Sequence, residues 1–119
     1  MPHHRVLIVD DEPLIGQIIA SYLTKAEFNV IGPITNCADA LETIANNQID
    51  FAILDVNLYH ERSDAIAADL QTRNIPFVFM TGYSTDGLSE QFNDVTTLPK
   101  PSRAATVVDA VNKGLGLVA

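Results

Sequence analysis

The sequence has little cysteine, few basic residues and no tryptophan. Cys37 is the single cysteine among 119 residues, which excludes an internal disulfide and fits a reducing compartment. Only 7 residues are Lys or Arg against 15 Asp or Glu, and the net charge of −8 argues against a nucleic-acid partner. A signal peptide and an apolar run long enough to cross a bilayer are also lacking. We therefore expect a soluble, cytoplasmic protein that binds neither nucleic acid nor a membrane.

The composition is that of a globular protein, with 47% hydrophobic residues. A chain of 119 residues suits one domain. Such a domain buries roughly two-thirds of its unfolded surface, so it needs neither a metal nor a disulfide to fold. The sequence shows no repeat, no low-complexity tract and no internal linker. We expect a single domain over residues 1–119.

The stretch 49–57 organises the rest of the chain. Residues 51–54 form a short continuous apolar run between polar neighbours, which is typical of a strand buried on both faces of a parallel sheet. Asp55 follows at the carboxyl end, where such a sheet opens into a ligand crevice. A carboxylate there can act as a nucleophile or a metal ligand, or it can simply cap the next turn.

Similar runs recur along the chain and alternate with helical patterns. Gly32–Pro33 is expected to stop the second strand, and residues 57–62 read as a polar loop. The expected strands cover residues 5–9, 28–31, 51–54, 77–80 and 95–98. Five strands alternating with five helices predict an α/β fold: one doubly wound, five-stranded parallel sheet with helices on both faces.

Each expected helix has a recognisable start or an apolar face. Pro13 begins the first helix, and Asn36, Ser63 and Ser102 are the expected caps of later ones. A short helix over residues 84–94 is the weakest pattern, because Gly87 interrupts it. The residues expected to face the core include Leu14, Ile15, Ile18, Ile19, Tyr22 and Leu23 in the first helix, and Leu41, Ile44 and Ala45 in the second.

The polar residues at the strand ends form a coherent set. Asp10 and Asp11 follow the first strand, Asp55 the third, Thr81 the fourth and Lys100 the fifth. The carboxyl ends of parallel strands lie on one edge, so these side chains should meet. They suit phosphoryl transfer, with Asp55 as nucleophile, a Mg²⁺ ion held by carboxylates, and Lys100 and Thr81 as partners of the phosphoryl oxygens.

Taken singly, each of these residues has an ordinary structural explanation. The acidic triplet Asp10–Asp11–Glu12 could be the acidic start of a helix, which the helix dipole favours. Thr81 could be a turn residue, and Lys100 could be a solvated charge. The joint placement at successive strand ends favours the functional interpretation.

With these motifs the chain resembles the receiver domain of bacterial two-component response regulators. The resemblance runs from Val6 to about Leu115 and rests on Asp10–Asp11, Asp55, Thr81 and Lys100–Pro101. It implies a flavodoxin-like fold with strand order 2-1-3-4-5 and, here, a receiver domain without an output domain. The implied function is that of a phosphoacceptor regulator, not an enzyme acting on a separate substrate.

The resemblance also implies roles for individual residues. Asp55 would accept a phosphoryl group from a histidine kinase or a phosphotransfer protein. The phosphorylated domain would then bind a downstream protein target. Mg²⁺ would be held by Asp11, Asp55 and the backbone carbonyl of Asn57, with Asp10 acting through water. The Lys100–Pro101 peptide would be cis, as in the family.

The chain departs from the family pattern at two positions near Lys100. The family usually has Tyr or Phe three residues before the lysine, where this chain has Thr97, and Pro99 directly before Lys100 is also unusual. Residues 79–83 resemble the motif of the subfamily nicknamed FAT GUY, which lacks that aromatic switch residue and often pairs with kinases of the HWE type.

Two other functions compete with a phosphoacceptor domain. A haloacid-dehalogenase-like phosphatase also uses a strand-end Asp, but it commonly has a general-acid Asp where Asn57 stands, and its acidic pair follows the lysine. A degenerate receiver would serve only to bind proteins, and the intact set of site residues argues against it.

Overall fold

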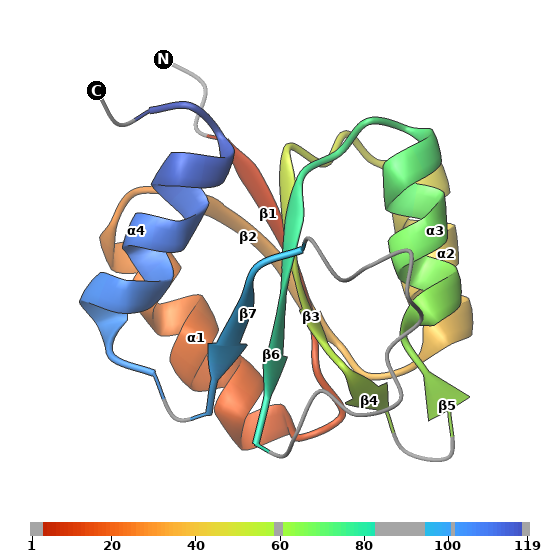
Figure 1. Cartoon of the computed structure of the whole chain (residues 1–119), viewed down its shortest axis with the longest axis horizontal. Coiled ribbons are helices and arrows are strands. Elements are labelled where there is room, and N and C mark those ends of the chain that lie inside the picture. Colours follow the sequence, from red (N-terminus) through yellow and green to blue (C-terminus); the bar gives the residue numbers. More distant parts are fainter. Residues whose placement is uncertain (1–3, 59–60, 83–94, 101, 118–119) are drawn as a thin grey trace.

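A computed structural model describes residues 4–58, 61–82, 95–100 and 102–117 (Figure 1). Five parallel strands form one sheet in the order β2-β1-β3-β6-β7. This is the order 2-1-3-4-5 of the five sheet strands along the chain, so the predicted doubly wound, flavodoxin-like sheet is confirmed. The strands are β1 (Arg5–Val9), β2 (Asn29–Ile34), β3 (Phe51–Asp55), β6 (Phe77–Thr81) and β7 (Thr97–Pro99).

Four helices lie in the described part of the chain, where five were expected. They are α1 (Pro13–Lys25), α2 (Cys37–Asn46), α3 (Asp64–Thr72) and α4 (Ala104–Gly114). The remaining helix was expected over residues 84–94, which lie outside the described residues. Within the described ranges, the helices are too short or too polar for any of them to span a membrane.

The helices cover both faces of the sheet, with α1 and α4 on one side and α2 and α3 on the other (Figure 1). The division follows from the alternation of side chains along each strand. In β3, Ala52 and Leu54 pack in the cluster that includes α2 and α3, whereas Phe51 and Ile53 pack in the cluster that includes α1 and α4. All five residues of β3 are buried, as expected for a central parallel strand.

β2 does not stop at Gly32–Pro33, as the sequence suggested, but continues to Ile34. Proline is tolerated because β2 is an edge strand, so its missing N–H leaves no ladder bond unmade inside the sheet. The pairing with β1 shifts between Leu7 and Val9, which pair with Ile31 and Ile34. The extra residue on β2 accommodates the Gly-Pro pair as a local irregularity.

The segment predicted as a polar loop after β3 contains a small hairpin instead. β4 (Asn57–Leu58) pairs with β5 (Glu61–Arg62) in antiparallel fashion. Ser63 follows and precedes α3 as predicted, but its hydroxyl donates a 3.0 Å hydrogen bond to the carbonyl of Val56 instead of capping the helix. The buried hydroxyl thereby ties the end of the hairpin to the end of β3.

Of the other two predicted helix caps, Asn36 is confirmed and Ser102 is wrong. The side chain of Asn36 accepts a 2.8 Å hydrogen bond from the backbone N–H of Asp39, which confirms the cap of α2. Ser102 does not cap α4: the residue next to the helix is Arg103, and the Ser102 hydroxyl donates to the carbonyl of Pro99. That hydroxyl therefore fixes the turn after β7.

The apolar faces of α1 and α2 are narrower than the sequence pattern predicted. Ile19 is buried, but Leu14 and Ile18 are 71% and 43% exposed. One residue along a helix rotates a side chain by about 100°, so Ile18 points away from the sheet that buries Ile19. The same rotation exposes Ala45 beside the buried Ile44.

Candidate functional site

The predicted polar residues lie together at the edge of the sheet where the strands have their carboxyl ends. Asp55 is the last residue of β3 and Thr81 the last of β6, while Asp10 follows β1 and Lys100 follows β7. Thr81 lies opposite Pro99 in the β6–β7 register, so these two strands end level with each other. Because all four strands are parallel, their carboxyl ends form the crevice edge expected for this architecture.

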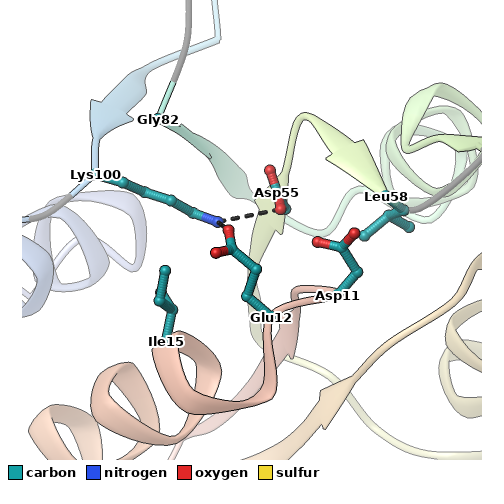
Figure 2. A pocket seen from close by; sticks show the side chains of 7 residues that line it. All are labelled: Asp11, Glu12, Ile15, Asp55, Leu58, Gly82 and Lys100. Atoms are coloured by element: carbon teal, nitrogen blue, oxygen red, sulfur yellow. Dashed lines mark hydrogen bonds and ion pairs between the residues drawn. The ribbon is translucent and has the colours of Figure 1, made fainter.

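Lys100 is the centre of the polar contacts at this edge. Its Nζ lies 2.7 Å from Asp10 Oδ2, 3.1 Å from Asp55 Oδ2 and 3.3 Å from Glu12 Oε1. Figure 2 shows Lys100 extending toward Asp55, with the Glu12 carboxylate at the same ammonium. The lysine therefore neutralises carboxylates from two other segments of the chain.

Burial and ion pairing act in opposite directions on the pKa of Lys100. Burial lowers that pKa, because it penalises the charged ammonium. The hydrogen bonds and charges of Asp10 and Asp55 outweigh burial and raise the pKa of Lys100 above 10.5. The side chain is consequently a permanent positive charge at neutral pH.

Four carboxylates crowd together beside the lysine. Asp10, Asp11, Glu12 and Asp55 each offer an oxygen, and these oxygens lie within 4.8 Å of one another. Like charges at this separation repel, so a single lysine leaves an excess of negative charge. Carboxylate oxygens in such number are the ligands of a hard cation such as Mg²⁺. The residues present therefore fit the magnesium site expected from the sequence.

A cavity of about 430 Å³ opens over Asp55 (Figure 2). Among the residues that the structure describes, a Cβ added at Gly82 would lie nearest to the Cβ of Lys100, at 3.9 Å, which is an ordinary van der Waals contact. The cavity is lined by Asp11, Glu12, Ile15, Asp55, Leu58, Gly82 and Lys100. The cavity lining therefore combines carboxylates and one ammonium group with two apolar side chains.

From the sequence, Glu12 was predicted only as part of the acidic triplet and not as a partner of Lys100. In the structure the Glu12 carboxylate reaches Lys100 across 88 residues of sequence. The sequence feature that could have suggested this contact is the position of Glu12 directly after the acidic pair and before Pro13.

The structure also places two other residues that the sequence singled out. Asn57 opens β4 two residues after Asp55. Thr97 opens β7 and is half-buried opposite Phe79.

Two further sequence predictions fall outside the described residues. The cis Lys100–Pro101 peptide involves Pro101, and the FAT GUY-like motif ends at Tyr83. Neither residue is among those that the structure describes.

Several known proteins are similar to this chain over most of its length. The family model described as response regulator receiver domain matches residues 6–112. The solution structure of SdrG from Sphingomonas melonis Fr1 is 39% identical, with a TM-score of 0.80 and 98% of each chain covered. The chemotaxis protein CheY of Bacillus subtilis is 30% identical over 94% of this chain and 98% of its own.

Other relatives are longer than this chain. The TorCAD operon transcriptional regulatory protein TorR of Escherichia coli is 32% identical over 90% of this chain but only 48% of its own length. The chain thus spans about half the length of that curated relative.

Proposed function

Because the chain belongs to the response regulator receiver domain family, we propose that Asp55 is its phosphoacceptor residue. Members of this family are phosphoacceptor signalling domains and are generally regulators, not enzymes. The observation that carries the proposal is the position of Asp55: it is 7% exposed, ends the central strand, lines the cavity and pairs with Lys100 at 3.1 Å.

The proposed reaction is a phosphoryl transfer to the Asp55 carboxylate. A carboxylate oxygen attacks the phosphorus of a phosphohistidine, a P–O bond forms and the P–N bond breaks. The electron pair of the P–N bond stays on the imidazole, and a proton on the ring keeps the leaving group neutral. The product is an acyl phosphate, whose charge Lys100 offsets and to whose oxygens the Thr81 hydroxyl donates.

A fixed lysine and a site for Mg²⁺ prepare this step. Asp10 holds Lys100 at 2.7 Å and is itself fixed by the backbone N–H of Glu12, which donates to Asp10 Oδ1 at 2.9 Å. Mg²⁺, held by Asp11, Asp55 and the Asn57 carbonyl with Asp10 acting through water, would supply further positive charge to the phosphoryl oxygens.

The proposed donor is a histidine kinase or a phosphotransfer protein, and the proposed receiver of the signal is a downstream protein. Leu14 and Ile18 are exposed on α1 close to Ile15 of the cavity wall, which suits a protein donor. The net charge of −8 favours protein partners over nucleic acid. The motif at residues 79–83 and the 39% identity to SdrG support assignment to the FAT GUY subfamily, with an HWE-type kinase as donor.

The decisive experiment is incubation with acetyl phosphate and Mg²⁺, followed by intact-mass measurement. We expect the mass of one phosphoryl group, absent without Mg²⁺ and absent in Asp55→Asn. Asp109→Asn is the matched control, because Asp109 is an exposed carboxylate of α4 paired with Lys113. Labelling of Asp55→Asn at the wild-type rate would contradict the proposal.

The same preparation distinguishes a receiver from a haloacid-dehalogenase-like phosphatase. A phosphatase hydrolyses many equivalents of p-nitrophenyl phosphate, whereas we expect no sustained turnover. The family match already favours the receiver. Sustained turnover that Asp55→Asn abolishes would reverse that conclusion.

A further inference from the structure

Glu12 makes the most exposed of the three ion pairs to Lys100. The side chains of Asp10, Asp55 and Lys100 are 3%, 8% and 7% exposed, whereas that of Glu12 is 58% exposed. Figure 2 shows the Glu12 side chain rising from the start of α1 to the lysine ammonium at the cavity. Two contacts of Lys100 are thus buried, and the third lies on the side open to solvent.

The backbone of Glu12 is held by two hydrogen bonds, but its side chain does not cap the helix that it precedes. Its N–H donates to Asp10, and its carbonyl accepts the first helical hydrogen bond from Gly16 at 3.0 Å. A residue at this position commonly caps the helix with its side chain. The Glu12 side chain makes no such hydrogen bond and contacts Lys100 instead.

We propose that Glu12 is a positioning residue that competes with the incoming phosphoryl group for the ammonium of Lys100. A lysine ammonium has three N–H donors, and here three carboxylates surround it. A phosphoryl oxygen therefore gains a donor only when one of these contacts breaks. The exposed Glu12 contact is the weakest, because solvent screens it, whereas breaking a buried contact leaves an unpaired buried charge.

The competition has a defined direction. Glu12 slows phosphorylation, because its contact must break first, and it shortens the lifetime of the phosphorylated state, because its carboxylate can reclaim Lys100. Exposed ion pairs have small energies, so we expect each effect to be about two- to fivefold. This inference rests on the proposed phosphorylation of Asp55.

The test compares three variants with the wild type under acetyl phosphate and Mg²⁺, with rates followed by intact mass. Glu12→Gln removes the charge. Glu12→Asp keeps the charge but is shorter by one C–C bond of about 1.5 Å, and an aspartate at this position favours capping α1. Glu42→Gln removes the same charge from an exposed position on α2 and is the matched control.

We expect both Glu12 variants to be phosphorylated about two- to fivefold faster than the wild type, and Glu42→Gln to be unchanged. If only Glu12→Gln is faster, negative charge at the cavity mouth is responsible and the proposed competition is wrong. If Glu12→Gln is slower and needs more Mg²⁺, Glu12 belongs to the metal site, which also overturns the proposal.

A second measurement needs neither Mg²⁺ nor phosphorylation. Brief acetylation with acetic anhydride, read by peptide mass spectrometry, reports access to Lys100, with the 68%-exposed Lys113 as the internal standard. We expect the Lys100 to Lys113 labelling ratio to rise in both Glu12 variants. An unchanged ratio means that Glu12 does not hold Lys100. Failure of the wild type to be phosphorylated at all would instead count against the proposed function.

Discussion

The backbone N–H of Lys100 donates a 2.9 Å hydrogen bond to the carbonyl of Thr81. This bond continues the β6–β7 ladder by one step beyond the pairing of Thr81 with Pro99. The two residues proposed to contact phosphoryl oxygens are consequently fixed relative to each other by the sheet. Thr81 ends β6, which pairs with β3, and the Lys100 ammonium lies 3.1 Å from Asp55 Oδ2.

Removing the Thr81 hydroxyl should slow phosphorylation without unfolding the protein. Thr81→Ala is expected to lose one hydrogen bond to the phosphoryl group, which amounts to about 0.5–1.5 kcal/mol or roughly a two- to tenfold lower rate. Thr81→Ser keeps the hydroxyl and should retain most of the rate. Acetyl phosphate labelling measures both variants, and equal rates for Ala and Ser would remove Thr81 from the reaction.

Replacing Lys100 should destabilise the fold itself. Lys100→Met leaves the carboxylates of Asp10 and Asp55 without the ammonium that both contact. Breaking a buried ion pair on one side costs about 3–5 kcal/mol, and we expect the lower end here because the cavity admits water. Urea denaturation measures the loss. Adding Asp10→Asn to Lys100→Met should restore part of it, and a further loss in the double variant would contradict this account.

The raised pKa of Lys100 predicts a pH dependence. Its ion pairs contribute their full stabilisation below the ordinary lysine value of 10.5, and that contribution declines as the pH rises above it through the higher pKa of the folded state. The free energy of unfolding of the wild type should therefore fall above pH 10.5. Lys100→Met lacks this component, so its decline should be shallower; parallel curves would count against the assignment.

Magnesium should stabilise the fold through the acidic cluster. Mg²⁺ that binds only the folded state raises the melting temperature with concentration. Asp11→Asn should abolish this rise, and it should leave the metal-free protein at least as stable, because one of four mutually repelling carboxylates is neutralised. Asp109→Asn serves again as the control. A full Mg²⁺ response in Asp11→Asn would remove Asp11 from the proposed ligands.

The sequence predicted the sheet well, because the information for each strand is local. The apolar run before Asp55 and the run before Asp10 are continuous, as strands covered on both faces must be. Alternation with helical patterns then implied parallel pairing. The same reasoning failed at Gly32–Pro33, because a proline is compatible with an edge strand and the sequence does not show which strand is at the edge.

Side-chain exposure was less predictable than the elements themselves. The periodicity in α1 marked Leu14 and Ile18 as core residues, yet the sheet covers only the stripe that contains Ile19. The width of that stripe depends on how closely the helix packs on its neighbours, which is a property of the assembled layers. The hydroxyls of Ser63 and Ser102 likewise found carbonyl acceptors outside their helices.

Local patterns are sufficient to predict the parallel sheet and the polar residues at its edge, because each strand and its end are specified by neighbouring residues. How the charges among these residues pair depends on the folded arrangement of the whole chain. Lys100 contacts Glu12 across 88 residues of sequence and Asp55 across 45. Such contacts form only when the assembled sheet brings the carboxyl ends of its strands together. The distribution of one ammonium over three carboxylates is therefore a consequence of packing that no local pattern encodes.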